Sequence, residues 1–366
     1  MWVWYFLFLG ILTALSFLGY GPDLSSFMFL PVLSFANRII KIGTITGAGG
    51  VTRGIDLPRK DLYRELYLRT SLVNTLTTVG PAVAALNDPY PIIKRIEVIA
   101  DGKDTLKSIS GVGLMQKNYW FYRRYMDRTM PALSAAALTM RAGLIVPFAM
   151  PKTVREADTF LDSSRLSLLE LRVTFGTDAD LYTTQPTTTA LTSISVAVHA
   201  HQAINLGKPL ALGVYKEGTI EKQVSATTSA LQVALPVGNA YRGFLIETEV
   251  DGNPADSLIN NIKVQSGTTV FYNADLPDAR EFWRAKNGLQ NIGAGSVVVN
   301  PAAGYGPTPG YHYIDFCPEG RLADALNTAN LSNLDIVFDV TMAGTTSYIR
   351  IFPDELVLPR IAAVRR

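Results

Sequence analysis

The sequence predicts an all-β protein made of two tandem jelly-roll β-sandwiches (a double jelly roll), with short helices and an N-terminal hydrophobic helix. Three observations support this fold class. One pattern occurs twice along the chain, short apolar runs are joined by proline and glycine, and each copy shows a single convincing helix. Many short strands with turn residues between them are typical of sandwiches and barrels. An α/β fold needs a helix between successive parallel strands and is therefore disfavoured.

The repeated pattern indicates a duplication of about half the chain. The motif L-x4-L-S-x-L-x-L-x-V begins at Leu161, and a closely similar pattern ending in phenylalanine begins at Leu326, 165 residues later. Repeats of about 20–50 residues indicate solenoids or propellers, so a period this long indicates two similar domains. Two shorter blocks recur in the same order: IEV at 96–98 with IKV at 262–264, and NYW at 118–120 with EFW at 281–283.

Residues 1–45 are predicted to form an N-terminal hydrophobic and amphipathic segment. Met1 to Pro22 contain no charged residue, and about 20 apolar residues in a helix can cross a bilayer core. A membrane anchor, a signal peptide without the usual positive start, and an upstream extension before Met28 all fit this stretch. Phe27 to Ile42 alternates apolar residues with two basic ones, which fits an interfacial amphipathic segment or a buried helix.

The first jelly roll is predicted over residues 46–208. Gly47 to Gly50 would form a flexible entry, and Asp101-Gly102 is a strong turn signal after a β-branched run. Residues 114–128 contain neither proline nor glycine, which predicts a helix. The strand candidates of this copy are 62–69, 91–100, 166–175 and 192–200.

The second jelly roll is predicted over residues 209–366, after a boundary rich in glycine at 202–223. A short helix is expected around 278–286. It would be followed by an exposed loop at 291–309, which is rich in glycine, proline and alanine. The strand candidates of this copy are 231–235, 244–250, 258–265, 268–272, 334–342 and 348–352.

The composition favours large buried interfaces over charge-driven binding. Hydrophobic residues make up 48% of the chain and charged residues 17%, below the usual quarter or so. A net charge of +2 gives the whole chain no electrostatic bias toward nucleic acid, and no specific nucleic-acid recognition is predicted. The single cysteine, Cys317, excludes an internal disulfide framework and a cysteine-rich zinc site.

The inventory of candidate catalytic and metal-binding side chains is short. His199 and His201 would share one face of a strand as two possible metal ligands, but no third histidine or cysteine lies near them in sequence. His312 fits an ordinary strand or loop residue, and Cys317 has no identifiable base partner. The sequence therefore predicts no catalytic residue, no cofactor-binding residue and no metal ligand.

Two acidic pairs could in principle serve a glycosidase, which needs two carboxylates across a cleft. Asp178 with Asp180, and Asp275 with Asp278, lie in polar, turn-like stretches, where capping explains them more simply. The chain has neither a phosphate-binding loop with Lys-Ser/Thr nor a G-x-S-x-G nucleophile elbow. These absences favour a protein that is not an enzyme.

Residues 117–128 interleave aromatic side chains with arginines, and this pattern has two interpretations. Aromatic rings and arginine can stack on single-stranded bases. Alternatively, the helix packs its aromatic side chains inward. The second copy favours this interpretation, because it retains aromatic residues at Phe282-Trp283 but has fewer basic residues around them. Arg360, Arg365 and Arg366 form a small basic tail that could face phospholipid or nucleic acid, or simply solvent.

Two stretches, 95–102 and 166–176, resemble the double jelly-roll major capsid proteins of tailless icosahedral viruses with an internal membrane, including lipid-containing bacteriophages. The resemblance extends over roughly residues 45 to 360. It implies a homotrimer whose six jelly rolls form a pseudo-hexagonal tile of an icosahedral shell, with no catalytic residues. The implied partners are neighbouring capsomers, vertex or minor capsid proteins, and the internal viral membrane through the N-terminal segment. The chain would be made in the host cytoplasm and located in the virion. The uncharged stretch before Pro22 departs from the short N-terminal helix usual in that family.

Two other functions remain open from the sequence. One is a membrane-anchored or secreted two-domain β-sandwich adhesin or carbohydrate-binding protein, which an exposed aromatic platform beside an acidic loop would favour. The other is a two-jelly-roll glycan hydrolase, which requires facing carboxylates at the junction of the two domains.

Overall fold

The computed structural model describes residues 36–78, 83–84, 88–122, 126, 128–129, 131–204, 213–287 and 309–357, with the side chains of residues 281 and 283–287 left out. Within these ranges, no helix has the length and apolar character needed to cross a membrane. The predicted N-terminal helix, most of the loop at 291–309 and the basic tail lie outside the described residues.

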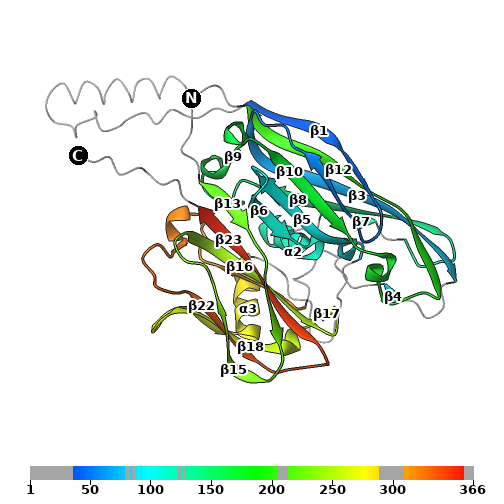
Figure 1. The fold of residues 1–366 in the computed structure, drawn as a ribbon. Helices are drawn as coiled ribbons and strands as arrows, with labels where there is room; N and C mark the ends of the chain where they lie inside the picture. Colours follow the sequence, from blue (N-terminus) through cyan, green and yellow to red (C-terminus); the bar gives the residue numbers. More distant parts are fainter. Residues whose placement is uncertain are drawn as a thin grey trace, which may run out of the picture. The chain divides into compact units, whose positions relative to one another are not determined.

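The first jelly roll consists of two facing four-stranded sheets (Figure 1). One sheet has the order β1-β12-β3-β8, and the short strand β7 (Arg128–Thr129) extends it. The other has the order β2-β10-β5-β6. Their bounds are β1 Ala36–Gly47, β2 Thr52–Asp56, β3 Leu62–Thr78, β5 Ile93–Ala100, β6 Asp104–Ile109, β8 Ala137–Pro147, β10 Leu169–Phe175 and β12 Thr188–Ile204.

The second jelly roll repeats this topology strand for strand. Its sheets have the orders β14-β23-β16-β20 and β15-β22-β18-β19, with every neighbouring pair antiparallel. The bounds are β14 Ile220–Val224, β15 Thr228–Ala234, β16 Ala240–Val250, β18 Ile259–Ser266, β19 Thr269–Asp275, β20 Tyr311–Asp315, β22 Asp335–Val340 and β23 Ser347–Val357. The predicted fold class is confirmed.

One strand joins the two rolls. β13 (Val214–Glu217) pairs antiparallel with β23 of the second roll and makes a single parallel bridge, Glu217 to Lys107, with β6 of the first. One sheet of each roll therefore becomes part of a continuous 11-stranded sheet among the described strands. The remaining short strands are β4 Val83–Ala84, β9 Leu161–Asp162, β11 Tyr182–Thr184, β17 Asn253–Pro254 and β21 Leu326–Asn327.

The duplication inferred from the sequence is visible in the register of the strands. In the first roll Val173 pairs with Ile96, and in the second Phe338 pairs with Ile262. The next inward-facing pairs also correspond, Leu171 with Val98 and Ile336 with Val264. Because a slip by one residue would move these side chains to the opposite face, the shared register means that both rolls bury the same repeated positions.

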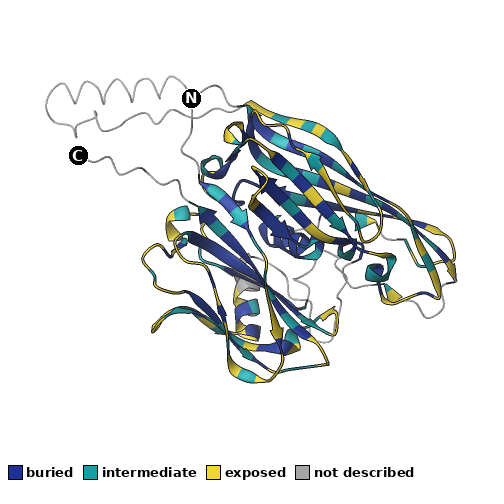
Figure 2. Ribbon diagram, in the orientation of Figure 1, coloured by how far each residue is buried: buried dark blue, intermediate teal, exposed yellow. Residues whose placement is uncertain are grey.

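Alternating apolar residues build each core (Figure 2). In β10, every second residue from Leu169 to Phe175 is buried, and the residues between them are more exposed. The first core combines both sheets of the first roll with four side chains of the second: Leu245, Tyr311, Tyr313 and Phe352. The second core contains residues of the second roll alone. The two rolls therefore share apolar contacts at their junction.

Among the described residues, each roll has one α-helix at the same place in the chain. α2 (Gly111–Tyr122) follows β6 and contacts both sheets of the first roll, and α3 (Leu276–Asn287) follows β19. The helix expected around 278–286 is confirmed. The helix expected at 114–128 is shorter than predicted: α2 ends at Tyr122, and β7 forms within the predicted range.

The N-terminal prediction needs one correction within the described residues. Residues 36–42 belong to strand β1, so they form neither an interfacial segment nor a buried helix. Their pairing with β12, far away in sequence, decides this conformation, and local periodicity could not reveal it. The predicted limits of the two jelly rolls, 46–208 and 209–366, stay predictions.

Candidate functional site

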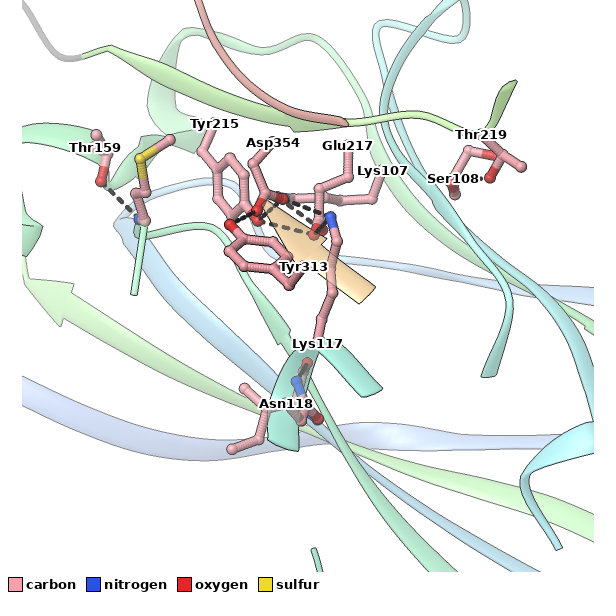
Figure 3. Close-up of polar contacts among 12 residues, drawn as sticks. Lys107, Ser108, Lys117, Asn118, Thr159, Tyr215, Glu217, Thr219, Tyr313 and Asp354 are labelled. Carbon is pink, nitrogen blue, oxygen red and sulfur yellow. Dashed lines mark hydrogen bonds and ion pairs between the residues drawn. The ribbon is translucent and has the colours of Figure 1, made fainter. Parts of the chain in front are cut away.

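The most unusual site lies at the junction of the two rolls, where polar side chains are completely removed from water (Figure 3). Strand β6 and helix α2 supply two lysines from the first roll. On the side opposite the first roll, strands β13, β20 and β23 supply two carboxylates and two tyrosines. We call this group the junction cluster; its members are Lys107, Lys117, Tyr215, Glu217, Tyr313 and Asp354.

Lys117 is the centre of the cluster. Its Nζ donates hydrogen bonds to Glu217 Oε1 at 2.8 Å and to Asp354 Oδ1 at 2.5 Å, and all three side chains are 0% exposed. Lys117 lies in a largely buried helix, since ten of the twelve residues of α2 are buried. A lysine in such a helix must find carboxylates, since an unpaired buried ammonium is very costly.

Lys107 forms an ion pair with the other oxygen of the Glu217 carboxylate. Its Nζ lies 3.1 Å from Glu217 Oε2, an ion pair without good hydrogen-bond geometry, and 3.3 Å from the ring centroid of Tyr215. The Tyr215 hydroxyl lies 2.8 Å from Glu217 Oε1 and 2.6 Å from Asp354 Oδ1. The Tyr313 hydroxyl donates to the remaining oxygen of Asp354. The cluster therefore balances two ammonium groups against two carboxylates.

The pKa values reflect burial and pairing. Burial alone would raise the pKa of Glu217, but the ammonium groups of Lys107 and Lys117 outweigh it and lower that pKa to about 2. Burial lowers the pKa of Lys107 to about 8, although Glu217 opposes the shift. The pKa of Lys117 is raised, because its two carboxylates outweigh its burial. Burial raises the pKa of Tyr215 and Tyr313 well above the usual value, so both remain neutral donors.

Aromatic contacts extend the junction. Tyr313 packs against Trp120 and Phe121 of α2, with ring centroids 6.0 and 5.6 Å apart. The guanidinium of Arg242, which is 1% exposed, lies 4.8 Å from the centre of the Phe121 ring and donates to the carbonyl of Pro151. These contacts exclude water from the ion pairs, which strengthens the ion pairs and would make any broken pair costly.

The cluster is suited to holding two domains in one orientation. Its carboxylates and ammonium groups are enclosed and paired with one another, and Lys107 Nζ and Glu217 Oε2 form an ion pair without a hydrogen bond. Removing one partner of a buried ion pair leaves an uncompensated charge, at a cost of about 3–5 kcal/mol. A rotation of one roll against the other would separate these charges and would meet the same kind of penalty.

The histidines considered as possible metal ligands have other contacts in the structure. Within the described ranges, no three side chains of the ligand types His, Cys, Asp and Glu come together in a way that could hold a metal ion. His199 lies beside the Tyr67 ring, and His201 Nδ1 lies 3.2 Å from Glu65 Oε1. His312 is buried, with its Nε2 3.3 Å from the Tyr272 hydroxyl, and burial lowers its pKa to about 3.

Cys317 and the acidic pairs have structural surroundings. Cys317 is buried, and burial raises the pKa of its thiol to about 12, which makes it a poor nucleophile. Asp180 accepts a hydrogen bond from the backbone NH of Thr177 and pairs with Lys94 at 2.6 Å. Asp275 accepts from Asn261, and Asp278 lies in the first turn of α3. These contacts fit the turn and capping roles expected for both pairs.

The aromatic residues of segment 117–128 lie in the core where they are described. Tyr119, Trp120 and Phe121 are all buried, as the inward-packing interpretation predicted. Arg123, Arg124 and Tyr125 lie outside the described residues. Sequence reasoning named Lys117 only as part of this segment and missed the rest of the junction cluster. Each missed residue is a single charged or aromatic residue within a strand. Such residues occur in many strands, so their sequence context does not identify a site.

A second polar group lines a cavity of about 550 Å³ beside the junction. Arg350 contacts Glu247 at 3.5 Å and Glu249 at 2.5 Å, and both carboxylates line this cavity. Burial raises the pKa of Glu247, although Arg350 opposes the shift. Carboxylates therefore line a cavity beside the junction, but Glu247 and Glu249 are both engaged by Arg350.

Comparisons with known proteins identify the fold through structure alone. No family model and no curated protein sequence matches the chain. The crystal structure of the STIV major capsid protein is similar with a TM-score of 0.69 at 14% identity, covering 90% of this chain and 100% of that chain. Major capsid protein P2 from bacteriophage PM2 gives a TM-score of 0.57 at 15% identity, covering 87% and 98%. The Faustovirus major capsid protein gives 0.56 at 9% identity, covering 96% and 97%. The chain shares the double jelly-roll fold with these proteins over nearly their whole length.

Proposed function

We propose that this chain is the major capsid protein of a tailless icosahedral virus with an internal membrane, and that it works as a homotrimeric shell tile. The observation that carries the proposal is the pair of rolls with identical topology, held together by a fully buried ionic junction. Three such chains supply six similar units, the number that a threefold trimer needs to occupy a sixfold lattice site. The similarity to three viral major capsid proteins supports the same function.

The partners follow from this function. Further copies of the chain would form the trimer and the neighbouring capsomers, and the uncharged N-terminal segment would contact the internal membrane. Vertex or minor capsid proteins would complete the shell. The chain would be made in the host cytoplasm and located in the virion, would recognise no specific nucleic acid sequence, and would use no cofactor or catalytic centre. We propose 46–208 and 209–366 as the two structural units, with strand β1 of the first roll already beginning at Ala36.

The mass of the purified, untagged protein in solution tests the proposal. Sedimentation or native mass spectrometry should give a stable species three times the mass of the chain, because the tile needs a closed ring of three subunits. A protein that remains monomeric at high concentration would contradict the proposal.

A glycan hydrolase is the second candidate, because Glu247 and Glu249 line a cavity at the domain junction and burial raises the pKa of Glu247. Turnover of a glycan that is abolished by Glu247→Gln would favour this function. The contacts of Arg350 Nη1 with both carboxylates argue against it.

A further inference from the structure

Two reactive groups of the junction cluster lie against each other without a hydrogen bond (Figure 3). Lys107 Nζ is 3.1 Å from Glu217 Oε2, and both side chains are 0% exposed. The two residues are also direct partners in the parallel bridge between β6 and β13, so their side chains leave the sheet on the same face. The backbone therefore holds an amine and a carboxyl group together in a place that is sealed from water.

The surroundings of Lys107 favour the uncharged amine. Burial lowers the pKa of this lysine from the usual 10.5 to about 8, and the like charge of Lys117 acts in the same direction. Lys107 Nζ lies 3.3 Å from the centre of the Tyr215 ring, an aromatic wall in place of solvent. A lysine that is desolvated beside another cationic group is a typical nucleophile. Loss of a proton from Lys107 therefore gives a nucleophilic amine directly beside the Glu217 carboxyl group.

The other oxygen of Glu217 is surrounded by hydrogen-bond donors. Lys117 Nζ donates to Glu217 Oε1 at 2.8 Å, and the Tyr215 hydroxyl lies 2.8 Å from the same oxygen. Donors held at a carbonyl oxygen stabilise the negative charge that develops there when a nucleophile adds to the carbon. Oε1 is therefore placed to become the oxygen of an amide, and Oε2, which faces Lys107, is placed to leave.

We propose that Lys107 and Glu217 condense into an isopeptide bond that links β6 to β13. One proton of the Lys107 ammonium passes to Glu217 Oε2, and the neutral Nζ then attacks Glu217 Cδ. A second proton follows to the same oxygen, which leaves as water. The bond that forms is Nζ–Cδ and the bond that breaks is Cδ–Oε2, so the two opposite charges disappear together. The step needs no oxidant, reductant or further reactant.

Enclosure is what makes this condensation feasible. The ion pair is the resting form, because the two lysines hold the pKa of Glu217 at about 2, and the neutral pair is a minor form, so the reaction is slow. Fixed contact compensates for this, since well-oriented groups within one molecule reach effective molarities of about 10⁵–10⁸ M. The product also replaces two buried charges by a neutral amide, which removes the cost of keeping those charges away from water.

The product leaves the junction balanced. Lys117 keeps Asp354 as a carboxylate partner at 2.5 Å, and the Tyr313 hydroxyl still donates to the other oxygen of Asp354. One ammonium group then faces one carboxylate. The new bond closes the chain between residues 107 and 217, and a covalent link across so long a loop restricts the unfolded chain strongly. It would tie the first roll to the strand that joins both rolls, whether or not the protein forms the proposed trimer.

Intact mass spectrometry of the folded, full-length protein tests the bond. The wild-type chain should be lighter than its sequence by one water molecule, whereas Lys107→Arg should have its full mass. Arginine keeps the positive charge at this position, but its guanidinium stays protonated and cannot attack. Lys216→Arg is the matched control, because Lys216 pairs with Asp104 instead of Glu217; this variant should lose the water as the wild type does. A chain kept in denaturant should retain the water and lose it only after refolding.

Peptide mapping of the wild type locates the bond without any substitution. Trypsin should leave Lys107 uncut and release a branched peptide in which residues 104–117 are joined to residues 217–222. A folded wild-type protein that has its full mass and is cut after Lys107 would overturn the inference. So would a loss of water that Lys107→Arg retains or that maps to another residue. None of these results would bear on the proposed shell function, which the mass of the native assembly tests separately.

Discussion

At the scale of single residues, the junction cluster shows how buried charges can specify an arrangement of domains. Lys117 contributes two hydrogen bonds to carboxylates that lie 100 and 237 residues away in sequence. Such contacts depend on the final fold, and the sequence around each residue does not predict them. By contrast, the Asp101-Gly102 turn was predictable, because Asp101 and Gly102 adopt positive φ angles of 53° and 72° that this local pair tolerates well.

Removing one carboxylate from the junction cluster should destabilise the protein strongly. Glu217→Gln leaves Lys107 and Lys117 with a single buried carboxylate, so we expect a loss of about 3–5 kcal/mol in the free energy of unfolding. Chemical denaturation measures this. Glu221→Gln is the matched control, because the Glu221 side chain is 50% exposed where it pairs with Arg350. It should cost no more than about 1 kcal/mol. Equal effects of the two changes would contradict the proposed role of the cluster.

His312 should make the protein sensitive to acid. Its pKa is about 3 in the folded protein, compared with an unfolded value of 6.5, because burial disfavours the imidazolium. Between these values the unfolded chain binds more protons, so stability should fall as pH decreases, by up to about 1.4 kcal/mol per pH unit from this group. Denaturation midpoints from pH 7 to pH 4 should show a smaller acid dependence in His312→Gln than in the wild type. An identical dependence in both proteins would refute this assignment.

At the scale of elements, some strands and turns could be predicted from the local sequence. Strong alternation predicted β10, and the turn at 101–102 and the repeated motif identified the matching strands of both rolls. β1 was misassigned because Ile39, Ile40 and Ile42 fit a helical face as well as a strand face. Its strand conformation depends on pairing with β12, which is distant in the sequence and could not be predicted from local patterns. The burial of α2 could not be predicted from the sequence either, because it depends on which strands pack over the helix.

The tyrosine contacts at the start of β3 and β16 should be equivalent in energy. Tyr63→Phe and Tyr241→Phe each remove one hydrogen bond to a proline carbonyl, which should cost about 1 kcal/mol. Because the two sites lie in different rolls, their effects on the free energy of unfolding should add in the double variant. Tyr348→Phe is the control and should change stability by less than about 0.5 kcal/mol. A large effect at one site and none at the other would argue against equivalent construction of the rolls.

At the scale of the whole molecule, one chain contains two jelly rolls and the buried junction between them. The internal junction fixes two jelly rolls against each other, and three chains of the proposed trimer would supply six. High apolar content and low charge fit a protein that buries much of its surface in assembly. The sequence predicted the fold class through the repeat and the family resemblance, whereas the junction cluster became visible only in the folded structure. The trimer stays a prediction.

The N-terminal segment should act independently of the sandwiches. Deleting residues 1–27, which include the uncharged stretch, should leave the β-domains folded and weaken binding to lipid vesicles, because the apolar surface for the bilayer is lost. Vesicle flotation measures the binding, and thermal unfolding of the same variant reports on the fold. If the deletion unfolds the protein, the segment belongs to the core and the membrane role is wrong.

Cryo-electron microscopy of the assembled protein tests the central claim most directly. The account predicts tiles of three chains with six similar lobes, in which the two rolls of each chain are joined by the junction cluster. Particles with three lobes, or open filaments in place of closed tiles, would contradict it.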